Sequence, residues 1–311
     1  MKGLMAIRAA RALSTNKGYF SDAVAATQKN DPLVSAYIEK AATSGATTAD
    51  FIALAGSPIA RELGEYIFSQ SVIGKLLGNA QNLPFGVPLA SFHAIGADWL
   101  REGESIPLRK GSVSDDKLSI FKIAAMAVIS KELERLATTG SDLAIRNTLT
   151  SEAVRKIDEK FLSQDSEVAG LSPAGILKDA ETATDLADMV SKHVDNGNKI
   201  STSYLIVPLA NVGSITEEML RQIDLLKLQV ICSEYATRTA LIDASNLIAN
   251  VQGTLIDVSS SSSVEMTDEP VGSISGTGSV EMVSLYQTNA SAYRAITYCS
   301  WAAVGKPATI L

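Results

Sequence analysis

The chain has 311 residues, of which 46% are hydrophobic and 20% are charged, and its formal net charge at pH 7 is −7. This hydrophobic content excludes a disordered chain, and the length suffices for one large or two modest folded domains. The acidic balance argues against a general nucleic-acid-binding protein, which would normally be basic. A low charged fraction is consistent with surface that is buried against other chains, and a large core within a monomer would also explain it.

The first 29 residues differ in charge from the rest of the chain. They carry a net charge of +4, which leaves −11 for the remaining residues. A basic segment on an acidic body is typical of contacts with acidic neighbours or with a polyanion, and a solvated, frayed terminus is the alternative. The residues of this basic arm are Lys2, Arg8, Arg11, Lys17 and Lys29.

Short helices are predicted in the next part of the chain. Apolar side chains recur at helical spacing within residues 19–42, and Pro32 is expected to begin the second of two helices there. A further helix is expected after Ser57-Pro58, where Ile59, Leu63 and Ile67 share one face.

Residues 83–129 are predicted to be extended, because Pro84 and Pro88 are incompatible with a helix interior. Their central part, residues 101–117, is highly charged and lies between apolar segments. This pattern predicts a solvated two-stranded projection, which would need another surface to lie on.

The longest helix is predicted over residues 131–162, with an interruption near Gly140. A second helix is expected over residues 174–194, ended by the stop signal Asn196-Gly197-Asn198.

The remaining residues alternate between short strands and helices, which predicts an α+β domain. The expected elements are a strand at 203–209, a helix at 216–223, a strand at 227–232, a helix-like or buried piece at 240–248 and a strand at 253–258. An alternating strand around residues 296–302 and the apolar end Ala308–Leu311 are expected to be buried and to pair with residues 121–129.

No pattern of reactive residues predicts an active site. His93 and His193 lack neighbouring metal ligands, and His193 is expected only to complement the dipole of a helix end. Cys232 and Cys299 are too few for a disulfide framework, which favours a reducing compartment. Neither a membrane span nor a secretion signal is recognised. We therefore predict no catalytic residue, no metal and no cofactor, and a protein that is not an enzyme.

Four segments, taken in order, resemble the major capsid proteins of tailed bacteriophages, and the resemblance covers about residues 83–311. They match an extended loop, a strand leading into a long spine helix, the first strand of an axial domain, and the last strands of a peripheral domain. In this chain the four segments are Trp99–Pro107, Lys122–Glu134, Ser203–Asn211 and Leu285–Leu311.

The resemblance implies an α+β fold, the phage major-capsid fold, with five regions. These are an N-terminal arm with short helices (1–82), an extended loop (83–129), a spine helix and peripheral domain (130–172), a mixed α/β axial domain (173–282), and C-terminal strands that return to the peripheral domain (283–311). The loop residues expected at a subunit interface are Trp99, Arg101, Glu102, Glu104, Arg109, Lys110, Asp115, Asp116 and Lys117.

The implied function is that of a structural major capsid protein, which self-assembles into an icosahedral shell around a viral DNA genome. Its partners would be further copies in hexamers and pentamers, scaffolding, portal or decoration proteins, and packaged double-stranded DNA bound non-specifically. It would reside in the virion after assembly in the host cytoplasm. The alternatives are an encapsulin-like compartment and a cytoplasmic α/β enzyme without a recognisable motif. The sequence leaves open the lattice size, the host, any cleavage, covalent cross-linking and the auxiliary proteins.

Overall fold

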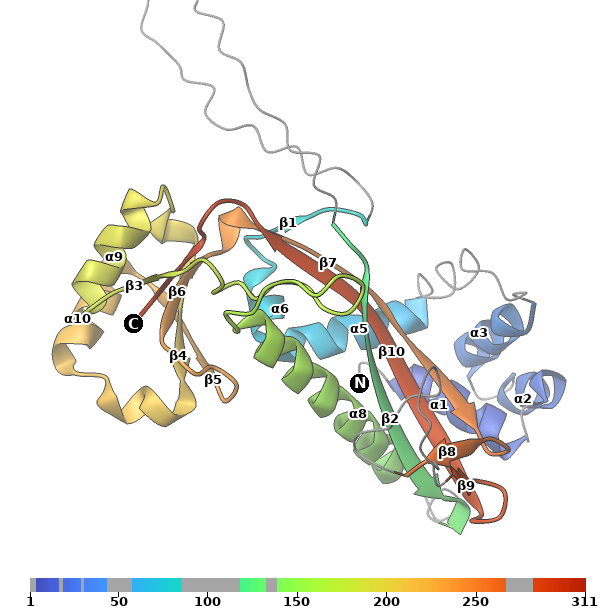
Figure 1. Cartoon of the computed structure of the whole chain (residues 1–311). Coiled ribbons are helices and arrows are strands. Elements are labelled where there is room, and N and C mark those ends of the chain that lie inside the picture. Colours follow the sequence, from blue (N-terminus) through green and yellow to red (C-terminus); the bar gives the residue numbers. More distant parts are fainter. Residues whose placement is uncertain are drawn as a thin grey trace, which may run out of the picture. The chain divides into compact units, whose positions relative to one another are not determined.

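The chain divides into two compact units, each built from separate stretches of sequence (Figure 1). The first unit comprises residues 1–75, 122–157 and 251–298, and the second comprises residues 76–121, 158–250 and 299–311. The computed structural model describes residues 4–16, 19–28, 31–43, 58–85, 118–132, 139–266 and 282–311.

The first unit begins with helices whose apolar faces pack together. Helix α1 spans Leu4–Thr15, α2 spans Phe20–Thr27 and α3 spans Pro32–Thr43, so the predicted break before Pro32 is confirmed. Their shared core contains Ala9, Ala23, Val34 and Ile38. The described part of the N-terminal region is therefore a packed helical cluster rather than a frayed tail.

Two further helices follow in this region. Helix α5 spans Pro58–Gln70, which confirms the helix expected after Ser57-Pro58, and α6 spans Val72–Leu76. Leu63 and Ile67 are buried, as the spacing predicts. Gly74 lies so close to the carbonyl oxygen of Phe68 that a Cβ there would be only 1.6 Å from it, so glycine is required.

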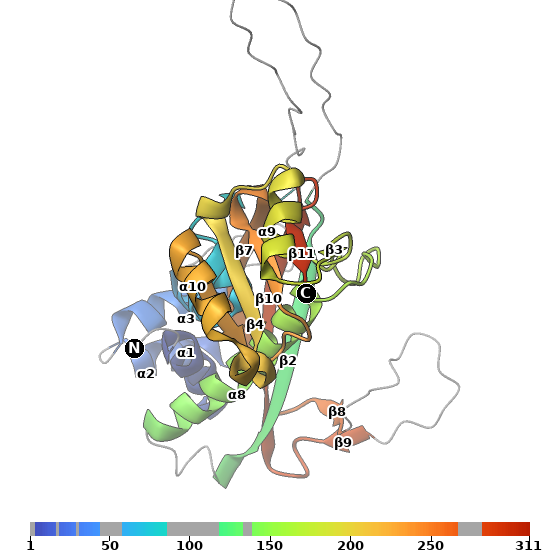
Figure 2. The ribbon, with the colours of Figure 1, turned by 90° about the vertical axis from the view of Figure 1, so that its left-hand side faces the viewer.

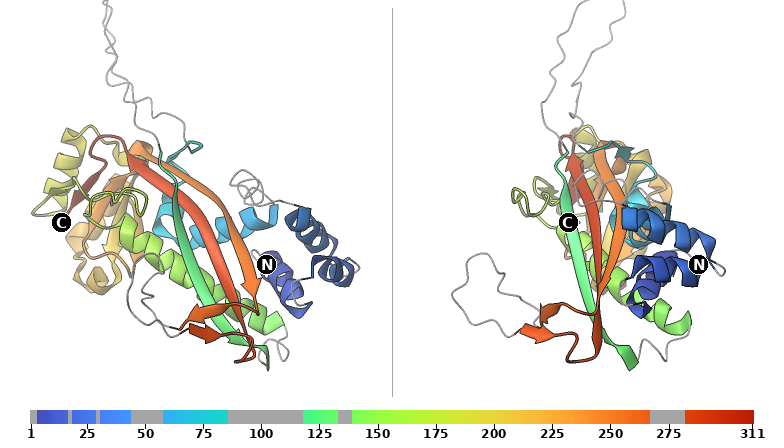
Figure 3. Two further views of the ribbon diagram at one scale, coloured as in Figure 1. Left: turned by 45° about the vertical axis from the view of Figure 1, so that its right-hand side comes forward. Right: turned by 90° about the vertical axis from the view of Figure 1, so that its right-hand side faces the viewer.

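A four-stranded sheet contains the longest strands of the protein, in the order β1-β7-β10-β2 (Figure 3). Its strands span Gln81–Asn82 (β1), Phe121–Ser130 (β2), Leu247–Ser259 (β7) and Ala290–Ala303 (β10). The predicted pairing of the alternating C-terminal strand with residues 121–129 is confirmed, because β10 neighbours β2. On β7 and β10, the buried hydroxyls of Thr254 and Thr297 are hydrogen-bonded at 2.7 Å.

A short antiparallel pair of strands also belongs to the first unit. It joins β8 (Ser263–Glu265) to β9 (Met282–Ser284), and Leu285 is fully buried immediately after it.

Helix α8 spans Thr139–Phe161 and is the long helix expected from the sequence. The interruption predicted near Gly140 is not tested, because residues 133–138 lie outside the described residues; α8 itself begins at Thr139, so Gly140 lies in its first turn. Apolar residues four positions apart form its buried stripe, which contains Leu149, Ala153, Ile157 and Phe161.

The second unit is built on a five-stranded mixed sheet in the order β3-β11-β6-β4-β5. The strands span Glu181–Thr182 (β3), Ser203–Pro208 (β4), Gln229–Ser233 (β5), Ala240–Asp243 (β6) and Ala308–Ile310 (β11). β4 runs parallel to β5 and antiparallel to β6, while β11 runs antiparallel to β6 and parallel to β3.

Two helices pack against this sheet, α9 (Leu186–Asp195) and α10 (Glu217–Leu226) (Figure 2). Short 3₁₀ turns span Ile200–Thr202, Leu209–Ser214 and Ala244–Asn246. Met189 of α9 and Ile223 of α10 share a hydrophobic core with Leu205 and Val207 of β4. The predicted strands near 203–209 and 227–232 and the helix near 216–223 are confirmed.

Several predictions for the second unit are wrong. The helix expected over residues 174–194 begins only at Leu186, because residues 181–182 pair with β11 and Asp185 then caps the helix. Of the two alternatives for residues 240–248, the buried one is confirmed for most of them and the helical one is wrong, because they form a strand, a 3₁₀ turn and the start of β7. Residues 308–310 are buried but pair with β3 and β6, not with residues 121–129.

The position of β11 predicts a large effect of truncating Ile310, which is fully buried. Ile310→Ala should lower the free energy of unfolding by about 2–5 kcal/mol, because it removes buried methyl groups and leaves a cavity. The control Leu311→Ala changes a neighbouring residue that is 37% exposed and should cost under about 1 kcal/mol. Urea unfolding monitored by circular dichroism measures both values, and equal losses would contradict this account of β11.

Candidate assembly surfaces

The residues predicted for the extended loop lie outside the described residues. This applies to Trp99, Arg101, Glu102, Glu104, Arg109, Lys110, Asp115, Asp116 and Lys117, and likewise to Lys2, Lys17 and Lys29 of the basic arm.

The other two residues of the basic arm, Arg8 and Arg11, lie on helix α1. The guanidinium of Arg8 is 3.5 Å from the carboxylate of Asp31, and both side chains are more than a third exposed. An exposed ion pair of this kind contributes little to stability. Part of the arm's positive charge is thus paired within the chain and held on a folded helix.

The second unit has a buried polar centre around Asp243. Its carboxylate accepts hydrogen bonds from the backbone N–H of Lys199 at 2.9 Å, the hydroxyl of Thr202 at 2.6 Å, and both the N–H and the hydroxyl of Ser245 at 2.9 Å. Burial opposes the charge of Asp243, but these donors outweigh it and lower the pKa of the carboxyl group. The carboxylate therefore ties the turn before β4 to the turn after β6.

His193 is fully buried beside this centre and joins three elements of the unit. Its Nε2 lies 2.9 Å from the hydroxyl of Ser203, and its Nδ1 lies 3.2 Å from the hydroxyl of Thr309. The Ser203 hydroxyl donates its hydrogen to the carbonyl of Lys199 at 2.6 Å, so the imidazole must donate from Nε2 and accept at Nδ1.

This arrangement holds the imidazole neutral. Burial lowers the pKa of His193 from its ordinary 6.5 to about 4, although the nearby charge of Asp243 acts in the opposite direction. The prediction that His193 complements a helix dipole with positive charge is therefore wrong at neutral pH. Its role is that of a polar link among α9, β4 and β11.

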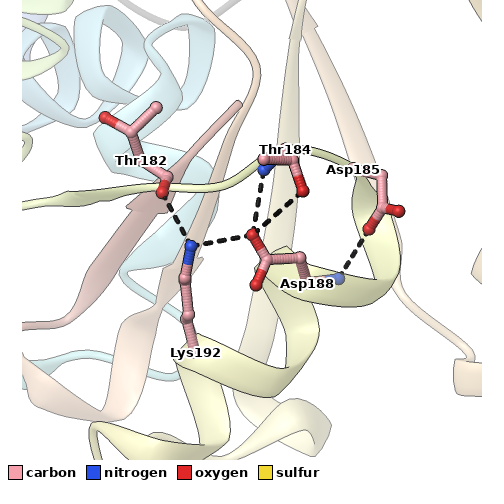
Figure 4. Close-up of polar contacts among 5 residues, drawn as sticks. All are labelled: Thr182, Thr184, Asp185, Asp188 and Lys192. Carbon is pink, nitrogen blue, oxygen red and sulfur yellow. Dashed lines mark hydrogen bonds and ion pairs between the residues drawn. The ribbon is translucent and has the colours of Figure 1, made fainter.

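A surface cluster fixes the start of α9 (Figure 4). The carboxylate of Asp185 accepts the backbone N–H of Asp188 at 2.7 Å and caps the helix. The Asp188 carboxylate accepts the N–H of Thr184 at 2.9 Å and pairs with the Lys192 ammonium at 2.7 Å, which lowers the pKa of Asp188. Lys192 also donates to the carbonyl of Thr182 at 3.0 Å. The cluster thus fastens β3 to the first turns of α9.

Large apolar side chains are exposed along a short stretch of the second unit. Leu225 on α10 is 82% exposed and Leu220 on the same helix is 54% exposed. Leu209 precedes this helix and Val230 follows it on β5, and both are also exposed. These exposed apolar side chains are candidates for burial against another protein.

A cavity of about 210 Å³ lies beside α10, within the second unit. Its floor is formed by the buried residues Leu205, Val207 and Ile223. The exposed side chain of Arg238 lies at its edge. The other lining residues are Asn211, Ile215, Met219, Thr237, Thr239 and Leu311.

Among the described residues, no group of three or more His, Cys, Asp or Glu side chains is arranged to hold a metal ion. In the same part of the chain, no helix combines the length and apolar character needed to cross a membrane.

Comparison with known proteins identifies the family. The model of the phage capsid family matches residues 54–229, which is more than half of the chain. The chain belongs to the phage capsid family. The match favours the capsid interpretation over an encapsulin-like compartment or an enzyme, and the family is one of structural shell proteins.

One curated relative and two solved structures extend this result. The capsid polyprotein of Pseudomonas phage PAJU2 is 26% identical over 350 residues, covering 96% of this chain and 52% of the relative, so the chain spans about half of that protein. A chain from Mycobacterium phage Adephagia has a TM-score of 0.51 at 16% identity, covering 76% of this chain and 88% of that one. A chain from Microbacterium phage Oxtober96 has a TM-score of 0.53 at 12% identity, covering 78% and 90%.

These likenesses confirm the predicted α+β phage major-capsid fold. The sequence analysis did not find the polar centre around Asp243 or the cavity beside α10. Thr202, Asp243 and Ser245 carry no motif spacing that would have joined them. The one available signal for the exposed surface was the pair Leu220 and Leu225, which does not share the helical face of Met219 and Ile223.

The buried, neutral His193 predicts destabilisation in mild acid. Because its folded-state pKa of about 4 lies below the ordinary 6.5, the unfolded chain binds an additional proton between these values. The free energy of unfolding should therefore fall as pH decreases from 6.5 to 4, by about 3 kcal/mol in total from this group.

Urea unfolding at several pH values measures this effect. The variant His193→Gln, whose side chain does not titrate, should lose less stability over the same interval, whatever its absolute stability. The carboxyl group of Asp243, whose pKa is lowered, contributes only at the acidic end of this interval, and because both proteins retain it, the comparison isolates the contribution of His193. Parallel pH profiles for both proteins would contradict the assignment.

Proposed function

We propose that this chain is a structural major capsid protein whose identical copies assemble into the icosahedral shell around a phage DNA genome. The observation that carries the proposal is the phage capsid family match over residues 54–229. The fold shared with chains of two phage particles supports it.

The surface of the second unit supports a role in assembly. Leu225 is 82% exposed and Leu220 and Val230 are also exposed on consecutive elements, and large exposed apolar side chains of this kind become buried when subunits assemble. Contacts between different patches of identical subunits are heterologous, and they close into rings when the rotation between subunits permits. Hexamers and pentamers are the rings proposed for this chain.

The regions implied by the resemblance complete the proposal. Residues 83–129 act as an extended loop over a neighbouring subunit, α8 serves as the spine helix, and residues 1–29 act as a basic arm. Residues 173–282 form the axial domain. Scaffolding, portal or decoration proteins and non-specifically bound double-stranded DNA are the further partners, and assembly takes place in the host cytoplasm.

Electron microscopy of the purified chain tests the proposed function. The expected result is closed icosahedral particles, formed by this chain alone or together with a co-expressed scaffolding protein. Particles isolated from a phage lysate should protect DNA from added nuclease. Monomers under all of these conditions would refute the proposal, and particles that hold protein cargo but no DNA would favour a compartment instead.

The extended loop has its own test. Residues 101–117 combine high charge with few apolar anchors, so contact with a neighbouring chain should order them. Hydrogen exchange should show rapid exchange at these residues in isolated subunits and strong protection in assembled particles. Residues 203–208 of β4, which are buried within the second unit, provide the control and should be protected in both states. Equal, strong protection of the loop in both states would overturn this prediction.

A further inference from the structure

The solvent-facing side of helix α10 carries an exposed apolar side chain, Leu225, which is flanked by charged residues and is called the knob below. Ile223 faces the core, and Leu225 lies two residues further on, which places it about 200° around the helix. Leu225 is 82% exposed, more than any other large apolar side chain of the described residues. Asp224, next to it, is also exposed.

The cavity beside α10 suits such a knob. Its volume of about 210 Å³ exceeds the roughly 150 Å³ of a cavity that admits a benzene molecule, so it has room for a leucine side chain, and its lining combines apolar residues with Asn211, Thr237 and Thr239. The lining residues Leu205, Val207 and Ile223 are apolar and buried, and the exposed Arg238 also lines the cavity. A leucine side chain bound there would be transferred from water to an apolar environment, which is favourable.

Charges on the two surfaces are complementary. Exposed residues on the outer side of α10 include Glu217, Glu218 and Asp224 against Arg221, with the exposed Lys227 at its C-terminal end, so the surface has a small net negative charge. Arg238 at the cavity is exposed and basic. Within the described residues, neither Asp224 nor Arg238 takes part in an ion pair. A contact between the two surfaces would pair these charges.

We propose that Leu225 of one copy inserts into the cavity beside α10 of the next copy, with Asp224 pairing with the neighbour's Arg238. This proposal rests on the function proposed above and names the contact that links subunits in a ring. A second copy of the chain is the occupant, because the same unit carries both a knob and a complementary cavity. Two different patches of one surface give a heterologous contact, which is the kind that repeats around a closed ring.

Charge reversal tests the contact. Asp224→Arg and Arg238→Asp should each raise the protein concentration needed for ring or particle formation by about tenfold, equivalent to about 1.4 kcal/mol. The double variant should restore assembly toward the wild-type concentration, since the pair is re-formed with opposite sign. Both side chains are exposed, so the melting temperature of the unassembled subunit should stay unchanged in all variants.

Disulfide trapping locates the contact directly. In a Cys232→Ser background, Leu225→Cys combined with Thr237→Cys should give a ladder of covalent oligomers under mild oxidation of assembled protein. The remaining Cys299 is buried, which raises the pKa of its thiol to about 12 and keeps it unreactive. The control pair replaces Leu225 by the similarly exposed Leu171, and Leu171→Cys with Thr237→Cys should give no ladder.

Each outcome decides between the two proposals. Wild-type particles together with rescue by the double variant and a ladder specific to residue 225 support the contact. If the wild type forms particles, any one of three results would refute the contact while leaving the capsid function in place: unaffected single variants, no rescue by the double variant, or equal ladders from both cysteine pairs. Failure of the wild-type chain to assemble under every condition would refute both.

Discussion

The second unit depends on a single topological constraint, the insertion of β11 between strands β3 and β6 of its sheet. Residues 308–310 pair with residues 181–182 on one side and with residues 240–242 on the other. The sheet therefore joins segments separated by more than one hundred residues, and it cannot close until the last strand is in place. Such non-local pairing carries a large loop-closure entropy and slows folding. His193, which bonds the hydroxyl of Thr309, fastens the inserted strand.

Local signals in the sequence predicted many elements but not their partners. Pro32 and the stop signal Asn196-Gly197-Asn198 mark real helix ends, because they act through backbone geometry alone. The helix expected from residue 174 failed, since apolar spacing cannot reveal that residues 181–182 join a strand at the far end of the chain. Residues 240–248 were ambiguous for the same reason, as a short buried run fits either a strand or a helix.

The surfaces relevant to assembly were predictable only in part. The resemblance to capsid proteins supplied the fold class, which the family match then confirmed. The cavity beside α10 could not be predicted, because its floor combines two residues of β4 with one residue of α10 and exists only after the helix has packed on the sheet. The charged loop proposed over residues 101–117 rests on composition alone, and the neighbour that it would contact has no signature in the sequence of one subunit.

The hydroxyl pair of Thr254 and Thr297 has a consequence for strand alignment. Strands as long as β7 and β10, of 13 and 14 residues, can in principle pair in more than one alignment. A slip by one residue would move each side chain to the opposite face of the sheet. It would also leave two buried hydroxyls without partners, each costing about 1–3 kcal/mol. The hydroxyl pair therefore stabilises one register of the two strands relative to registers shifted by one residue.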